Sequence, residues 1–263
     1  MRKYLALVRL AVQNALAYRG PMVVWLASNL VILVTMIAVW TSATGSGLIG
    51  GYSKGELVSY YIASLFLQWL NGWYPFYWIR TEVRDGSIAG NTLTKPISFY
   101  WRVFAAESGW HLVSTPIGIF ASAAVASFVP QYAAFSFGVN FWVAVIAVIL
   151  SIFVVFTTSL CMGILTFWLT NLNTIDSTFW AAKIFLGGQG IPLSFLPPSL
   201  LSVVNLLPFR YMFSFPLEIY FNKLNHHELI TGFSIQIFWI IILTMLYQVL
   251  WTNGRKAYSS FGN

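Results

Sequence analysis

Charged residues are scarce in this chain. Its 263 residues include only 7 Asp and Glu and 14 Lys and Arg, so charged residues make up 8% of the sequence while apolar residues make up 58%. Soluble domains contain about 25% charged residues. The composition therefore excludes an ordinary soluble domain and directs attention to the membrane.

Several catalytic and cofactor motifs are also absent. The pattern G-x-x-x-x-G-K-[ST] does not occur, so the chain cannot hold ATP phosphates in a P-loop. There is no H-E-x-x-H spacing, and we expect the adjacent His226, His227 and Glu228 to form a surface turn without a metal. A single cysteine, Cys161, excludes an intrachain disulfide. We therefore predict no enzyme activity, metal or cofactor in this chain.

Uncharged apolar sequence is what the chain has in abundance. A membrane-spanning helix needs about 20 such residues, because a rise of about 1.5 Å per residue must cross about 30 Å of hydrocarbon. Backbone amides in lipid must bond internally, which favours helices. We predict an all-α integral membrane protein, a single transmembrane domain over 1–263. Its six predicted spans are 21–42, 57–78, 104–128, 139–168, 177–196 and 230–252.

The distribution of Lys and Arg predicts the orientation. With the N-terminus in the cytoplasm, most basic residues fall on the cytoplasmic side, as the positive-inside rule requires. These are Arg2, Lys3, Arg9, Arg19, Arg80, Arg84, Lys95, Arg102, Arg255 and Lys256. Only Lys54, Arg210 and Lys223 then lie outside. We predict cytoplasmic termini and a bacterial plasma membrane location, and we read the net charge of +7 as a topology signal.

Two segments are apolar without being spans. Residues 1–20 are amphipathic, which predicts a helix lying in the cytoplasmic interface. The outer region 197–229 and the residues just before it carry five prolines, which a continuous span would not tolerate. We expect short re-entrant helices there, for example over 198–207 and 212–222. Such backbone is allowed in the membrane only where protein or a cavity covers it, so this region should line or cap something.

The predicted cytoplasmic loop 79–103 is the most polar part of the chain, with six charged residues between Arg80 and Arg102. Ile79, Val83 and Ile88 can anchor it on the membrane domain. Glu82, Arg84 and Asp85 can pair with opposite charges on a partner. These features favour a docking element, and the alternative is a set of solvated loop charges without a partner.

Aromatic residues crowd the second predicted span. Gln68, Trp69, Asn71 and Trp73 could form the wall of a cavity for an amphipathic or lipid-like cargo. The alternative for the aromatic residues is an interfacial belt combined with ordinary packing.

Four ionisable residues lie in or near the predicted spans. Glu107 and His111, spaced i and i+4, share a helix face and serve either transport or structure. Asp176 is expected to cap a helix that begins at Ser177. Lys183 either extends to the cytoplasmic surface or faces a cavity.

Three segments carry a resemblance to a known family. They are Glu82-Val83-Arg84-Asp85-Gly86-Ser87-Ile88 with Leu93-Thr94-Lys95-Pro96-Ile97-Ser98, then Gly190-Ile191-Pro192-Leu193-Ser194-Phe195-Leu196-Pro197 with Leu207-Pro208-Phe209 and Pro216, and finally Gly254-Arg255-Lys256-Ala257-Tyr258. Together with the six predicted spans, they resemble the permease subunit of type-2 ATP-binding-cassette (ABC) exporters, in the small six-span branch with a separate ATPase.

The resemblance implies partners and site residues. It implies two ABC ATPase subunits that bind ATP and Mg, and a second permease copy or a sister permease. The implied ATPase-coupling residues are Glu82, Val83, Arg84, Asp85, Gly86 and Ile88. The implied outer-gate residues are Gly190, Pro192, Pro197, Pro208, Phe209 and Pro216. Residues 89–91 lack the acidic residue that is frequent in the family at this place.

The predicted function is export of a hydrophobic or amphipathic cargo, driven by ATP hydrolysis in partner subunits. The alternative is an ATP-independent secondary transporter or channel, for which inverted repeats and ionisable residues near the middle of the membrane would be expected.

Overall fold

The computed structural model describes residues 2–18, 20–42, 47–132 and 135–258. Within these residues the chain is helical, and β pairing is limited to an isolated bridge between Ile49 and Tyr52. In chain order the elements are α1 (Arg2–Ala17), α2 (Gly20–Ser42), α3 (Lys54–Leu70), α4 (Phe76–Arg84), the π-helix η1 (Ala89–Leu93), α5 (Phe99–Phe128), α6 (Val139–Ile164), the 3-10 helix η2 (Leu165–Phe167), α7 (Asn173–Leu186), the 3-10 helix η3 (Leu193–Phe195), α8 (Pro198–Val204), α9 (Pro208–Met212), α10 (Ser214–Tyr220) and α11 (His226–Ala257). Arg19 lies outside the described residues.

Four of the described helices are long and apolar enough to cross a membrane. They are α2, α5, α6 together with η2, and α11, with 23, 30, 29 and 32 residues. At about 1.5 Å per residue, even the shortest extends about 35 Å, more than the hydrocarbon thickness of about 30 Å. The all-α prediction is therefore confirmed for the described residues, and these four helices match four of the predicted spans.

The predicted helix over 57–78 is wrong in its second half. Helix α3 ends at Leu70, residues 71–75 are not helical, and α4 begins only at Phe76. Pro75 accounts for the interruption, because proline has no backbone N–H and disfavours helical conformation in the residue before it.

The predicted helix over 177–196 is wrong at both ends. Helix α7 begins earlier, at Asn173, and stops at Leu186. Its 14 residues extend only about 21 Å. The proline-rich region does form short helices, three in the described residues where one or two were expected: α8, α9 and α10. Pro198 and Pro208 lie in the first turns of α8 and α9, where a missing N–H costs little.

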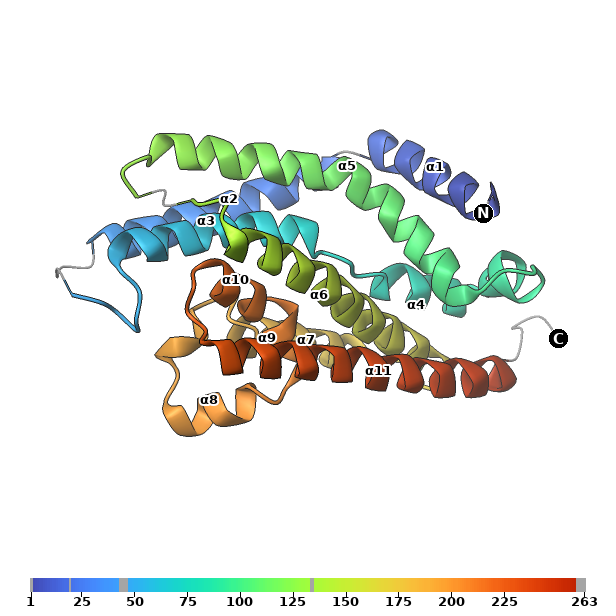
Figure 1. Cartoon of the computed structure of the whole chain (residues 1–263). Helices are drawn as coiled ribbons and strands as arrows, with labels where there is room; N and C mark the ends of the chain where they lie inside the picture. The colour runs from blue at the N-terminus through green and yellow to red at the C-terminus, as the bar shows by residue number, and fades with distance from the viewer. Residues whose placement is uncertain (1, 19, 43–46, 133–134, 259–263) are drawn as a thin grey trace.

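Helix α6 runs through the middle of the molecule (Figure 1). It packs against α11, α10, α4 and α9. Its Val154, Phe156 and Leu160 are completely buried. The contacts of α6 therefore join the α4 segment to the proline-rich short helices.

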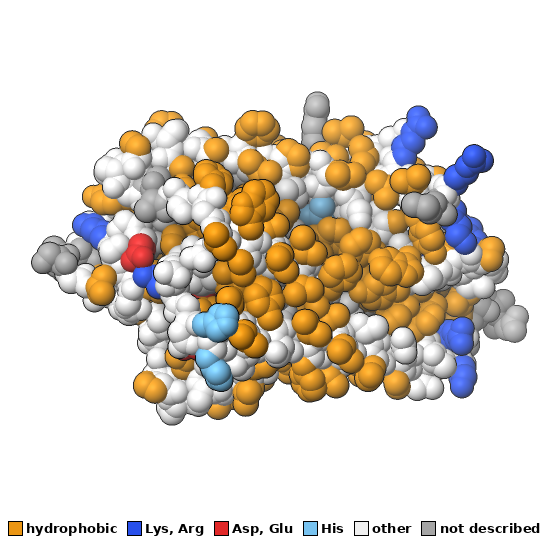
Figure 2. All heavy atoms as spheres, in the orientation of Figure 1, with side chains coloured by type: hydrophobic (Ala, Val, Ile, Leu, Met, Phe, Trp, Pro, Cys, Tyr) orange, Lys and Arg blue, Asp and Glu red, His pale blue; other side chains and the backbone are white. Residues whose placement is uncertain are grey.

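The two ends of the elongated molecule differ in charge. The start of α1, the loop between α4 and α5, and the end of α11 lie at one end in Figure 1, and Figure 2 shows Lys and Arg side chains gathered there. We call it the basic end. Apolar side chains cover most of the visible surface between the two ends. The α2–α3 loop and α8 lie at the opposite end.

Helix α1 is held closely on α5 at Gly109. A Cβ atom on Gly109 would collide with the Ala11 side chain and with the Val8 carbonyl oxygen of α1. Glycine is required here by the close approach of two backbones.

We predict that Gly109→Leu loosens α1 from α5 at a cost of about 2 kcal/mol, the usual size of an overpacking effect. Tryptic cleavage after Arg9 should become several times faster in the purified protein. Gly47→Leu is the matched control, since a Cβ at Gly47 meets nothing within 4 Å. Equal cleavage rates in both variants would contradict this assignment.

Candidate functional site

The α4–α5 loop at the basic end is built on a buried apolar base. Helix α4 turns Ile79 and Val83 inward, and Ile88 follows beyond the turn; Ile79 and Ile88 are fully buried and Val83 is 5% exposed. They pack in one cluster with side chains of α5, α6 and α11. Gly86, with φ +79°, makes the turn that a residue with a side chain would adopt only with strain. The loop is therefore fixed to the membrane helices beneath it.

Glu82, which was predicted to pair with a charge on a partner, is engaged within the chain. Its two carboxylate oxygens accept from the Arg102 guanidinium at 3.1 and 2.5 Å, and the Asn91 amide donates to it at 2.9 Å. Arg102 also lies 5.4 Å from the ring centres of Trp78 and of Phe99. Glu82 thus fastens α4 to the start of α5.

Arg84 and Asp85 do stay at the surface. Arg84 donates to the Thr170 carbonyl oxygen beyond η2. Asp85 is exposed and accepts from the Ser87 backbone N–H at 2.9 Å. Hydrogen bonds from the Ser87 side chain and backbone hold the pKa of Asp85 below its usual value. A carboxylate that is ionised at neutral pH therefore marks the exposed turn.

Both ends of the described chain contact this loop. Lys3 donates to the Pro96 carbonyl oxygen at 2.5 Å, and the Ser98 N–H donates to the Tyr4 hydroxyl at 3.3 Å. From the end of α11, the Tyr258 hydroxyl donates to the Gly86 carbonyl oxygen at 3.0 Å. Displacement of the loop would therefore pull on α1 and α11 as well as on α4.

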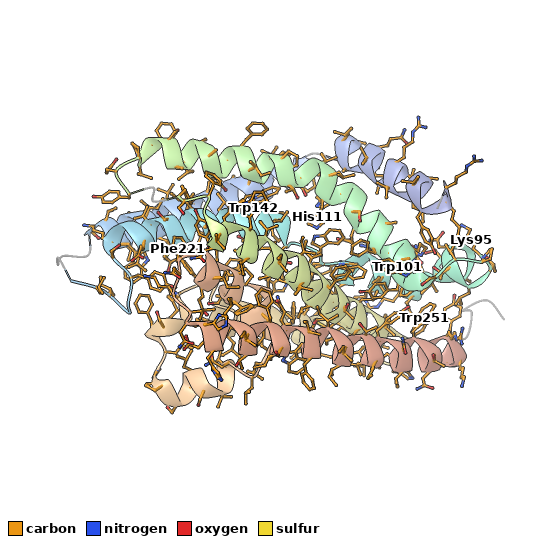
Figure 3. The ribbon with its side chains drawn as sticks, in the orientation of Figure 1. Lys95, Trp101, His111, Trp142, Phe221 and Trp251 are labelled. Carbon is orange, nitrogen blue, oxygen red and sulfur yellow. The ribbon has the colours of Figure 1, made fainter. Side chains whose placement is uncertain are left out.

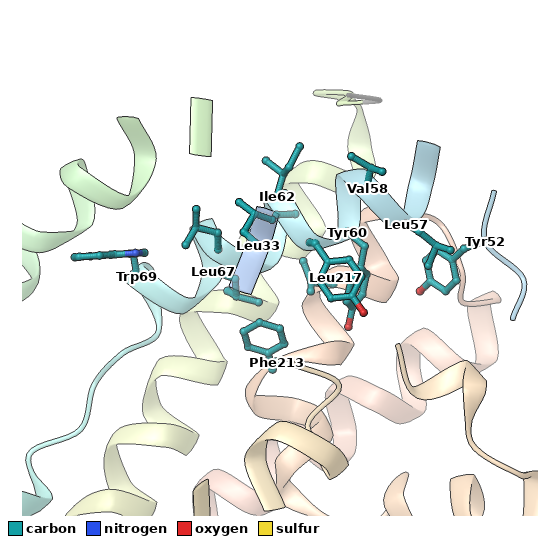
Figure 4. Packing of buried hydrophobic residues seen from close by; sticks show 13 residues of the cluster. Leu33, Tyr52, Leu57, Val58, Tyr60, Ile62, Leu67, Trp69, Phe213 and Leu217 are labelled. Carbon is teal, nitrogen blue, oxygen red and sulfur yellow. The ribbon is translucent and has the colours of Figure 1, made fainter. Parts of the chain in front are cut away.

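Helix α3 is bonded to the proline-rich region. The Tyr60 hydroxyl donates to the Gly188 carbonyl oxygen at 2.6 Å, and the Tyr61 hydroxyl to that of Gly190 at 2.9 Å. At the end of α3 the Asn71 amide donates to the Met212 carbonyl oxygen. Figure 4 shows Tyr60 among the buried side chains between α3 and the α9–α10 segment. The helix that leads into α4 thus contacts the opposite half of the chain through three polar side chains.

The six predicted outer-gate residues differ in burial and in the contacts they make. Pro192, Pro208 and Pro216 are buried, whereas Pro197 is exposed. Gly190 binds Tyr61, and Phe209 lies 6.0 Å from the Phe179 ring.

A separate cavity of about 650 Å³ lies at the end of the molecule opposite the basic end. It is lined by other residues, among them Arg210, Glu218 and Lys223. Arg210 and Glu218 form an ion pair at 2.5 Å, and Lys223 pairs with Glu56 at 2.7 Å. The sequence analysis missed both pairs. The only feature of the sequence that pointed to these ion pairs was the presence of charges beside long uncharged stretches.

A second cavity, of about 440 Å³, is lined by residues of α1, α2, α3, α4, α5, α7 and the segment between α3 and α4. We call it the aromatic cavity, after Trp25, Trp69, Tyr74, Trp110 and Trp180 in its wall. Four of the six predicted cavity residues line it: Gln68, Trp69, Glu107 and His111. Gly72 and Tyr74 from the non-helical stretch also line it, which is where irregular backbone is tolerated in a membrane protein.

The other two predicted residues, Asn71 and Trp73, serve the structure around this cavity. Asn71 is directed to Met212, and the Trp73 ring stacks on His111 with ring centres 4.6 Å apart. Figure 3 places His111 near the middle of the molecule, far from Lys95 in the α4–α5 loop. Glu107 accepts a hydrogen bond from the Trp78 indole at 2.7 Å.

The comparison with known families decides the class of this protein. The model of the family described as ABC-2 family transporter protein matches residues 23–262. The chain belongs to the ABC-2 transporter family. No curated protein matches it.

Membership and the four long apolar helices together make this chain a multi-pass membrane component of a transporter. The family implies an ABC ATPase as partner and an oligomeric assembly. The resemblance read from the sequence motifs is thereby confirmed.

Asp176 and Lys183 are the charged residues of α7 in this ABC-2 protein. Asp176 was expected to cap a helix starting at Ser177, which is wrong because α7 already begins at Asn173. Its carboxylate instead accepts from the Tyr74 and Tyr77 hydroxyls. Lys183, for which two positions were open, lines the aromatic cavity.

We predict that Glu82→Gln destabilises the protein by about 3 kcal/mol, because it leaves the buried Arg102 without its counter-charge. The measurement is thermal unfolding in detergent. Asp85→Asn, three residues along the chain and exposed, is the control and should leave the unfolding temperature nearly unchanged. Similar shifts for the two variants would contradict the structural role of Glu82.

Proposed function

We propose that this chain is the permease subunit of an ATP-driven ABC exporter that moves a hydrophobic or amphipathic cargo out of the cell. The observation that carries the proposal is the α4–α5 loop of an ABC-2 family member. It combines a buried base at Ile79, Val83 and Ile88 with an exposed turn at Arg84 to Ser87. A loop that passes on force needs this combination of rigid attachment and free polar surface.

The proposed topology has six crossings, with α1 in the cytoplasmic interface and both termini in the cytoplasm. Helices α2, α5, α6 and α11 cross alone. α3 continues through residues 71–75 into α4, and α7 continues into the proline-rich region. The short helices α8, α9 and α10 then lie in the outer leaflet, as region 197–229 was predicted to do, and loop 79–103 faces the bacterial cytoplasm. The basic end supports this orientation through the positive-inside rule.

The coupling path in this proposal follows covalent and hydrogen-bonded connections. Two ABC ATPase subunits, which bind ATP and Mg, displace the α4–α5 loop through contacts at Arg84, Asp85 and Gly86. Helix α4 carries the displacement across residues 71–75 to α3. Tyr60 and Tyr61 then pull on the backbone of Gly188 and Gly190. Gly190, Pro192, Pro197, Pro208, Phe209 and Pro216 belong to the region that would move as the outer gate.

A second copy of the chain, or a sister permease, completes the transporter in this proposal. The ATP-independent alternative draws on one observation, the buried Glu107 and His111 beside the aromatic cavity. Co-purification distinguishes the two: an exporter permease retains a P-loop ATPase with vanadate-sensitive activity, whereas a secondary transporter or channel is purified without one.

We predict that Asp85→Arg and Gly86→Pro uncouple transport. The first reverses the charge of the exposed turn, and the second places a proline, whose φ is fixed near −65°, where φ is +79°. Permease-dependent ATP hydrolysis by the purified complex should fall about tenfold, within the range of typical coupling free energies. Both variants should remain in the membrane in normal amounts, and Gly90→Ala is the control, because a Cβ there meets nothing within 4 Å. Normal ATPase stimulation and transport in both variants would overturn the coupling assignment.

The topology gives a further prediction. Cys161 is the only cysteine and is buried, so Cys161→Ser provides a cysteine-free background. Ser87→Cys should react with an impermeant maleimide only after the cytoplasmic side is opened, whereas His226→Cys should react in intact cells. Both original residues are exposed, so access depends on the side of the membrane. Labelling of Ser87→Cys in intact cells would show that the orientation is wrong.

A further inference from the structure

The aromatic cavity contains ionisable groups of both signs, and they differ in how well the protein satisfies them. Two carboxylates lie in or beside its wall. Glu107 accepts from the Trp78 indole, and Asp176 accepts from the hydroxyls of Tyr74 and Tyr77. Both carboxylates therefore already have neutral donors from the protein.

Lys183 is the cation of the same wall, and it is 4% exposed. The ion pairs among the described residues join Arg102 to Glu82, Arg210 to Glu218 and Lys223 to Glu56, and none includes Lys183. Its ammonium group lies 5.0 Å from the centre of the Trp180 ring, a cation–π distance. A buried ammonium without an anion is costly. Lys183 thus gives the cavity wall one buried positive charge that has no anion within ion-pair distance among the described residues.

The rest of the wall is suited to apolar matter. Trp69, Trp110 and Trp180 contribute large ring surfaces, and about 440 Å³ lies within the usual range of ligand sites. Most of the wall surface is apolar, as expected for a site that binds a mostly apolar ligand and orients it through polar groups.

The cavity also reaches the surface of the chain between α2 and α7. Trp25 lines it and is nevertheless 54% exposed, and its ring centre lies 6.3 Å from that of Trp180. Because α2 is one of the apolar, membrane-length helices, a ligand passing Trp25 would enter from the side.

We propose that the aromatic cavity binds an amphiphile with a single anionic group, which pairs with Lys183 while the apolar chain lies against the tryptophan rings. The occupant is either a membrane lipid with an acidic headgroup or the exported cargo itself. The identification of this ligand as cargo rests on the proposed transport function. The existence of the binding site does not depend on that function.

The test compares two probes that share one chain and differ only in the headgroup. Bromoundecanoate is anionic at pH 8 and bromoundecanol is neutral, and bromine quenches tryptophan fluorescence at short range. With the full chain in neutral detergent, we expect bromoundecanoate to bind about tenfold more tightly, equivalent to about 1.4 kcal/mol. Lys183→Met should abolish this preference, and Lys183→Arg should keep it. Lys54→Met removes a charge at the end of the molecule opposite the basic end and should leave the preference unchanged.

Binding of bromoundecanol by Lys183→Met shows that the cavity is intact in that variant. If the variant binds neither probe, Lys183→Arg decides, because a retained preference supports the proposal and a lost one overturns it. Equal binding of the two probes by the unaltered protein, or a preference that survives Lys183→Met, also overturns it.

Two further measurements distinguish a membrane lipid from exported cargo as the ligand. An acidic phospholipid that co-purifies with the unaltered chain and is lost in Lys183→Met identifies a lipid. Stimulation of ATP hydrolysis by bromoundecanoate in the complex, absent in Lys183→Met, identifies cargo. Because probe binding needs no ATPase, failure here is distinguishable from failure of the coupling variants Asp85→Arg and Gly86→Pro.

Discussion

The ion pair between Glu82 and Arg102 is the interaction on which the basic end depends. It is bidentate, largely buried and flanked by the rings of Trp78 and Phe99. Burying two charges is costly, and the geometry must be good for the attraction to compensate. This ion pair fixes the position of α4 relative to the start of α5. The turn at Gly86, which lies between them, can therefore move little. The contacts from Lys3, Tyr4 and Tyr258 then act on a loop that is already in place.

The non-helical residues 71–75 connect three parts of the molecule, which are the α4–α5 loop, helix α3 and the aromatic cavity. They join α3 to α4 and so form the direct chain connection between the loop and the helix that carries Tyr60 and Tyr61. They also form part of the aromatic cavity through Gly72 and Tyr74. A cargo or lipid in this cavity would therefore touch the same segment that connects the loop to α3 in the proposed coupling path.

Part of this structure could be predicted from the sequence. Uncharged stretches of sufficient length identified α2, α5, α6 and α11, because the requirement for internal hydrogen bonding in lipid leaves few alternatives. Prolines located the short helices. The interruption at 71–75 was missed because its aromatic residues read as a continuation of the apolar span, although Pro75 signalled it. Two contacts depend on tertiary packing and could not be predicted from a local pattern. One is the pairing of Glu82 with Arg102, 20 positions away, and the other brings Lys183 together with α2 and α5.

The bond from Tyr258 to Gly86 has a consequence for biosynthesis. Chains emerge from the ribosome with their N-terminal parts first. The α4–α5 loop is therefore made long before the residue that completes it, which follows the whole of α11. Until that helix has been synthesised and inserted, the loop lacks one of its hydrogen bonds. An unfinished chain would therefore present an incompletely bonded loop until nearly all of the protein has been made.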